Sequence, residues 1–186
     1  MQTDSETLIE ELLALTARAS EAAKKFKELS PHQLNYRTSV DKWSILQCID
    51  HLNLYGDFYL PEIEKQILEN KALSKPRQFK SGIIGNYFAN LMKVRNGKVK
   101  KMKSPKDKAP SNSELTITTI ERFLKQQEHL RSLLMQARSV DLTKIKVAIS
   151  ITKFIRLRLG DTFRFFIYHI ERHIIQAESI KTNLKF

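Results

Sequence analysis

Apolar residues recur every three or four positions along most of the chain, which is the period of an amphipathic α-helix. Stripes of this kind begin near residue 3, at Ser44, near residue 114 and after Gly160-Asp161. The first stripe consists of Leu8, Leu12, Leu15, Ala19, Ala22 and Phe26. Only the β-branched stretch 145–152 has the composition of a strand, and we expect 141–159 to be irregular. The pattern predicts an all-α protein.

Polar residues predict where several helices begin. Asp161 is a good N-cap for the last helix, because its carboxylate can accept hydrogen bonds from free backbone N–H groups. Ser or Thr followed three residues later by Glu or Gln has the spacing of a capping box. Three such pairs occur: Thr3 with Glu6, Ser30 with Gln33, and Ser44 with Gln47.

Length and composition predict a single domain spanning 1–186. A chain of 186 residues with 41% hydrophobic content can bury one sizeable core. The N-terminus is acidic and lacks the pattern of a signal peptide, and no apolar stretch approaches the about 20 residues of a transmembrane helix. The single cysteine, Cys48, excludes an intramolecular disulfide. We therefore expect a cytoplasmic protein.

The net charge of +12 is concentrated in one segment. Residues 71–108 contain twelve Lys or Arg and one acid, whereas the remaining 20 basic and 19 acidic residues nearly cancel. Turn-forming residues surround one apolar run, so we expect a basic loop over 71–110 with a short helix at about 82–94. Such a loop could bind nucleic acid or an anionic membrane, or serve as a lid. A solvated loop is favoured, because its aromatic residues match no nucleic-acid motif.

The stretch FFIYHIERHIIQ places two histidines on the apolar face of the last helix. His169 and His173 are four residues apart, about 40° around the helix axis, in the same sector as Phe166 and Ile170. Burying an imidazole without a partner is costly, so the pair needs hydrogen-bond partners or a metal ion. The pattern alone leaves these two explanations equally open.

The order of residues disfavours a zincin protease. In H-E-x-x-H the Glu directly follows the first His, whereas Glu171 is two positions after His169 and points away from it. On the second long helix His51 lies at the border of the apolar stripe, where pattern alone favours a half-buried structural histidine. Asp50 and Asp57 point away from His51, so no general base can be named.

Two stretches resemble the DinB/YfiT-like family of metal proteins. The first is LSPHQLNYRTSVDKWSILQCIDHLN, with a W-S-I helix start leading to His51-Leu52. The second is LGDTFRFFIYHIERHIIQAESI, with His169, His173 and Gln176 on the last helix. Both family marks occur in the family's order and with compatible spacing, and the resemblance covers nearly the whole chain.

The resemblance implies an up-and-down four-helix bundle with a long crossover between helices 2 and 3. It implies that His51, His169 and His173 bind a divalent metal, and three neutral imidazoles suit Zn, Ni or Fe, with Zn favoured. Gln47 and Gln176 are candidates to orient a ligand. The resemblance also suggests a homodimer.

Function is less constrained than fold, because similar proteins include thiol-dependent transferases and hydrolases. We expect a metal-dependent enzyme that activates water or a low-molecular-weight thiol to attack a small-molecule substrate. The alternative is a non-catalytic, metal-stabilised bundle that binds nucleic acid or an anionic surface through the basic loop. Of these partners, nucleic acid is disfavoured.

Overall fold

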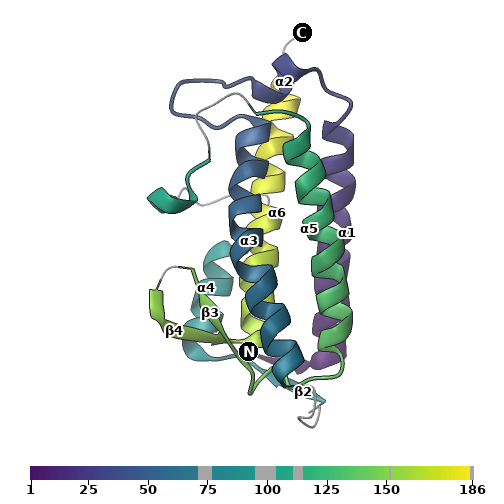
Figure 1. Cartoon of the computed structure of the whole chain (residues 1–186), viewed down its shortest axis with the longest axis vertical. Helices are drawn as coiled ribbons and strands as arrows, with labels where there is room; N and C mark the ends of the chain where they lie inside the picture. The colour runs from purple at the N-terminus through teal and green to yellow at the C-terminus, as the bar shows by residue number, and fades with distance from the viewer. Residues whose placement is uncertain (71–76, 95–103, 111–114, 151, 185–186) are drawn as a thin grey trace.

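The structure is a computed structural model that describes residues 1–70, 77–94, 104–110, 115–150 and 152–184, and most of it is helical (Figure 1). Its elements in chain order are β1 (Gln2–Asp4), α1 (Ser5–Phe26), α2 (Pro31–Asn35), α3 (Ile45–Glu69), β2 (Gln78–Lys80), α4 (Ile83–Met92), the 3-10 turn η1 (Lys106–Lys108), α5 (Thr118–Ala137), β3 (Lys146–Ile149), β4 (Thr152–Arg158) and α6 (Leu159–Thr182).

The four long helices α1, α3, α5 and α6 lie side by side (Figure 1). Helix α1 contacts α5 and α6, and α3 contacts the same two helices on the other side. The predicted apolar stripe of α1 is buried along its whole length, from Leu8 to Phe26. Burial of such stripes supplies the main stabilising term for helices of this length, and the prediction of a mainly helical protein is confirmed.

The helix starts agree with the sequence at two of four positions. Ser30 and Ser44 form complete capping boxes with Gln33 and Gln47, as predicted. At α1 the prediction was wrong, because Asp4 is the N-cap and its carboxylate accepts hydrogen bonds from the backbone N–H groups of Glu6 and Thr7. The predicted cap, Thr3, instead lies in β1, opposite Phe79 of β2.

The predicted N-cap of the last helix, Asp161, was also wrong. Helix α6 begins at Leu159, and Asp161 lies in its first turn, fully buried. Its carboxylate accepts hydrogen bonds from Gly82 N at 2.8 Å, from Arg164 Nη1 at 3.0 Å and from Ser81 Oγ. The side chain therefore binds the segment that begins α4 instead of capping its own helix.

Two small sheets qualify the all-α prediction. Strands β1 and β2 pair antiparallel, and β3 and β4 form an antiparallel hairpin in the region expected to be irregular. The hairpin forms because Val147 and Leu157 lie opposite each other and are both buried, while Lys146 beside them faces solvent. This is the alternation of a strand that has one buried face.

The basic segment 71–108 contains the predicted short helix, which is α4 and packs against α6. Residues 71–76 and 95–103, which carry much of the predicted loop and its charge, lie outside the described residues. Among the helices of the described residues, none has the length and hydropathy needed to cross a bilayer.

Candidate metal centre

Three buried histidines meet between α3 and α6. One candidate ligand atom from each of His51, His169 and His173 lies within 4.8 Å of the other two. All three residues are less than 9% exposed. The structure thus brings together the three residues that the resemblance marked. Two of them come from one helix and the third from a residue 118 positions earlier in the chain.

The ring of His51 is oriented by a backbone carbonyl. Its Nδ1 lies 2.5 Å from the carbonyl oxygen of Lys108, and Ser104 Oγ lies 3.5 Å from the same nitrogen. A carbonyl only accepts hydrogen bonds, so Nδ1 carries the proton and Nε2 presents a lone pair. That Nε2 lies 3.2 Å from Nε2 of His169.

The two histidines of α6 are held in different ways. His173 Nδ1 donates a hydrogen bond to Gln176 Oε1 at 3.0 Å, which leaves Nε2 as the atom with a lone pair. His169 Nδ1 is buried without a hydrogen bond within the described residues. Its ring is held instead by aromatic packing, with ring centroids 4.4 Å from Tyr55 and 6.2 Å from Phe165.

Burial keeps all three imidazoles neutral. It lowers the pKa of His51, although the Lys108 carbonyl opposes this shift, and it lowers that of His169 well below its usual range. Burial, together with the neighbouring His51 and Arg172, lowers the pKa of His173 to about 3. Neutral imidazole is the form that binds a metal, so these shifts favour ligation at neutral pH.

Two aromatic residues enclose the three rings. Trp43 precedes the capping box of α3, and its ring centroid lies 4.8 Å from His51 and 5.6 Å from His173. Tyr55, one turn after His51, contacts the rings of both His51 and His169. Trp43 was not predicted to contact the site, whereas helical spacing alone places Tyr55 beside His51.

The two glutamines expected near the site differ in position. Gln176 contacts His173 directly, as described above. Gln47 uses its side-chain oxygen in the capping box, where it accepts a hydrogen bond from Ser44 N at 3.1 Å. Sequence analysis also missed Lys108 and Ser104. Since the Lys108 contact is made by a backbone carbonyl, no residue type could have revealed it.

No carboxylate joins the cluster within the described part of the chain, and its members are histidines only. Asp57 is instead paired with Arg122 of α5, and Glu171 is half-buried on α6. Cys48, buried on α3, is also absent from the cluster, and burial raises the pKa of its thiol. A thiol in that environment stays protonated and unreactive.

One pair of donors has the spacing of two ligands on a shared divalent metal. Two imidazole nitrogens at about 2.0–2.1 Å from one tetrahedral ion lie about 3.3 Å apart, close to the 3.2 Å between the Nε2 atoms of His51 and His169. Three buried, neutral nitrogen donors suit Zn, Ni or Fe, and outer hydrogen bonds orient two of them, those of His51 and His173.

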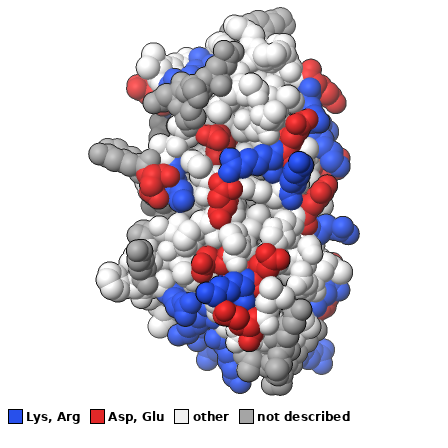
Figure 2. Space-filling view, in the orientation of Figure 1, with Lys and Arg blue, Asp and Glu red and all other residues white. Residues whose placement is uncertain are grey.

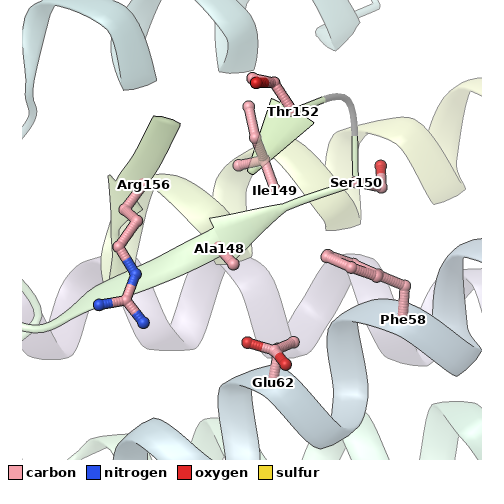
Figure 3. A pocket seen from close by; sticks show the side chains of 7 residues that line it. All are labelled: Phe58, Glu62, Ala148, Ile149, Ser150, Thr152 and Arg156. Carbon is pink, nitrogen blue, oxygen red and sulfur yellow. The ribbon is translucent and has the colours of Figure 1, made fainter. Parts of the chain in front are cut away.

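A separate cleft lies between α3 and the β3–β4 hairpin (Figure 3). Its volume is about 690 Å³, and its lining residues include Phe58 and Glu62 of α3 and Arg156 of β4. Phe58 follows His51 by seven residues, or about 10 Å along the helix. None of the three histidines lines the cleft, so it is distinct from the histidine cluster.

The fold and the buried three-histidine cluster together place this chain among mainly helical proteins that have a candidate metal site. Comparison with protein families agrees, because the DinB superfamily matches residues 12–177. The chain belongs to this superfamily, as its sequence motifs predicted. Neither the curated proteins nor the solved structures contain a significant match.

Proposed function

We propose that this protein is a metal-dependent enzyme that acts on a small-molecule substrate and uses water or a low-molecular-weight thiol as the nucleophile. His51, His169 and His173 are the proposed metal ligands, with Zn favoured over Ni and Fe. The observation that supports this most is the meeting of three buried, neutral imidazoles within 4.8 Å.

The surrounding residues have assignable roles in this proposal. The Lys108 carbonyl and Gln176 fix the protons of His51 and His173 on Nδ1, so that both Nε2 lone pairs remain available. Trp43 and Tyr55 pack against the rings and exclude water from their sides. A divalent ion bound there would lower the pKa of a water or thiol at an open coordination position.

Thiol chemistry fits the site somewhat better than hydrolysis. A hydrolase commonly needs a general base to take a proton from water, and no carboxylate of the described residues belongs to the cluster. A thiol has a much lower pKa than water and needs no separate base once it binds a cation. We therefore place a thiol S-transferase ahead of a hydrolase.

Elemental analysis tests the site directly. We expect near-stoichiometric divalent metal in protein purified without an affinity tag, and its loss in His173→Ala. His129→Ala is the matched control, because His129 lies on α5 with 38% of its side chain exposed. Metal content that is absent from the wild type after reconstitution, or equal in both variants, would contradict the site.

Turnover separates the enzyme from a metal-stabilised protein without catalysis. The metal-loaded protein would be assayed with several thiols and electrophilic acceptors, and with hydrolysable esters and amides. We expect thiol-dependent turnover that His173→Ala abolishes and His129→Ala retains. Metal binding without any turnover would favour the non-catalytic alternative, in which the basic segment binds an anionic partner.

Three further inferences accompany the proposal. We infer that the four long helices form the up-and-down bundle expected of the family, with α4 in the crossover between α3 and α5. We infer that residues 1–186 act as one domain in the cytoplasm. Homodimer formation stays a prediction that sedimentation velocity can test.

A further inference from the structure

Helix α4 exposes large apolar side chains to solvent. Ile83 is 93% exposed, Tyr87 64% and Ile84 52%. At 100° per residue, these three side chains fall within one sector of about 100° on the helix. The buried residues Gly85, Ala89 and Met92 lie on the opposite side, which faces α6. The helix is thus apolar on its outer face as well as on the face that packs against the protein.

This exposure differs from that of an ordinary surface helix, whose outer face is polar. Residues 83–92 contain no charged side chain, and the two asparagines, Asn86 and Asn90, lie outside the exposed sector. Exposed apolar residues that stand alone need no explanation, but neighbouring large ones mark an interaction surface.

Basic residues lie around the N-terminal end of α4. Arg158 donates a hydrogen bond to the Lys80 carbonyl at 2.6 Å. The Arg158 side chain also lies close to Gly82, the residue directly before Ile83, because a Cβ on Gly82 would be 3.4 Å from Arg158 Nε. Lys146 lies opposite Arg158 in the hairpin and is exposed, as is Lys80. Figure 2 shows Lys and Arg gathered over the end of the molecule where β3, β4 and the N-terminus lie. Between residues 77 and 93 the sequence contains no acid.

We propose that α4 and its basic border form a docking surface for an anionic lipid bilayer. Ile83, Ile84 and Tyr87 would enter the boundary between headgroups and acyl chains, while Lys80, Lys146 and Arg158 contact anionic headgroups. An aromatic residue with a polar tip, such as Tyr87, is favoured at this depth of a membrane. The surface lies outside the histidine cluster, so the proposal is independent of the metal.

Charge and chemistry favour a bilayer over the other occupants. A second copy of the chain docking through the same surface would bring two sets of cations together, which is unfavourable. Nucleic acid would use the cations, but isoleucine side chains offer neither a stacking face nor a hydrogen bond to a base. A lipid bilayer is the partner that satisfies both the exposed aliphatic groups and the cations.

Vesicle sedimentation tests the proposal with the full chain. We expect binding to vesicles of phosphatidylcholine and phosphatidylserine in equal parts, and much weaker binding to phosphatidylcholine alone. The double variant Ile83→Gln, Tyr87→Gln should bind about tenfold more weakly. Its fold should be preserved, because both side chains are exposed, and circular dichroism would check this. Lys80→Glu should weaken binding to the anionic vesicles only.

The matched control is Val40→Gln. Val40 is 84% exposed in the connection between α2 and α3, away from α4, and this variant should bind as the wild type does. Failure of the wild type to bind anionic vesicles would overturn the proposal, as would equal binding by the double variant and the control. Dimerisation that the double variant abolishes would assign the surface to a second copy. Capture by duplex DNA but not by vesicles would assign it to nucleic acid.

Discussion

The histidine cluster and the outer face of α4 depart in opposite ways from the usual distribution of residues. Between α3 and α6, three titratable side chains are buried among aromatic rings. On α4, two isoleucines and a tyrosine are exposed to solvent. Most surface and core positions are explained by folding alone, whereas a buried polar group or an exposed apolar patch is informative. Both departures therefore identify candidate sites, one for an ion and one for a surface.

Asp161 connects the two regions, because it lies on the helix of His169 and binds the start of α4. Asp161→Ala should lower the free energy of unfolding by about 3–5 kcal/mol, since it leaves the charge of the buried Arg164 without its carboxylate partner. Urea unfolding measures the loss. Asp57→Ala is the control, because it breaks a half-exposed pair with Arg122 and should cost less than about 1 kcal/mol. Equal losses would show that the connection has no special importance.

Acid should destabilise the metal-free protein through the histidine cluster. The pKa of His173 is about 3 in the folded protein and about 6.5 in an unfolded chain. Between these values the unfolded state binds more protons, so the free energy of unfolding decreases as the pH falls. His173 contributes up to about 1.4 kcal/mol per pH unit, and His51 and His169, whose pKa values are also lowered, add to this slope.

Urea unfolding across this pH range, with a chelator present, would measure the slope. His173→Gln should reduce this slope relative to the wild type, because it removes a group whose pKa burial lowers to about 3 in the folded protein. A slope in His173→Gln that equals that of the wild type would mean that the cluster does not control acid stability. Burial of the three histidines would then not affect acid stability, in contrast to what the comparison with α4 assumes.

Gly85→Ala should disturb α4 without changing its outer face. A Cβ at Gly85 would lie 2.4–2.6 Å from atoms of the Asp161 side chain, so one of the two must move. We expect a loss of about 1–3 kcal/mol in the free energy of unfolding, measured with urea. At Gly82 the nearest atom is 3.4 Å away, and Gly82→Ala should change stability by less than about 0.5 kcal/mol. If Gly85→Ala lowered the free energy of unfolding as little as Gly82→Ala, the packing of α4 against the buried Asp161 side chain would be looser than the structure indicates.

The sequence predicted the long helices well, because each has an apolar stripe, and α3 begins with a predicted capping box that formed. It predicted Asp161 wrongly, since its partners Ser81 and Gly82 are about 80 residues away. Local rules that describe capping cannot anticipate such a contact. The β3–β4 hairpin was missed for a related reason, because its alternation is short and depends on burial against α3 and α6.

For the candidate site, helical spacing placed His169 and His173 on one face, but it could not place His51 beside them. Only the family resemblance suggested that juxtaposition, since His51 lies at the border of its stripe. Trp43 carries a residue type common in any core, so its contact with the rings could not be predicted, whereas helical spacing alone places Tyr55 beside His51. The outer face of α4 was predicted only as a short helix, because sequence does not show which side of an apolar helix is covered.

The carbonyl of Lys108 makes the centre partly independent of side-chain identity. Replacing Lys108 by alanine would keep the carbonyl and its hydrogen bond to His51, so an alanine variant would not reveal this contact. The position of this carbonyl depends on the backbone conformation of Ser104–Lys108. Natural variation could therefore change the Lys108 side chain and preserve the orientation of His51, whereas deletion of a single residue in that turn would displace the carbonyl.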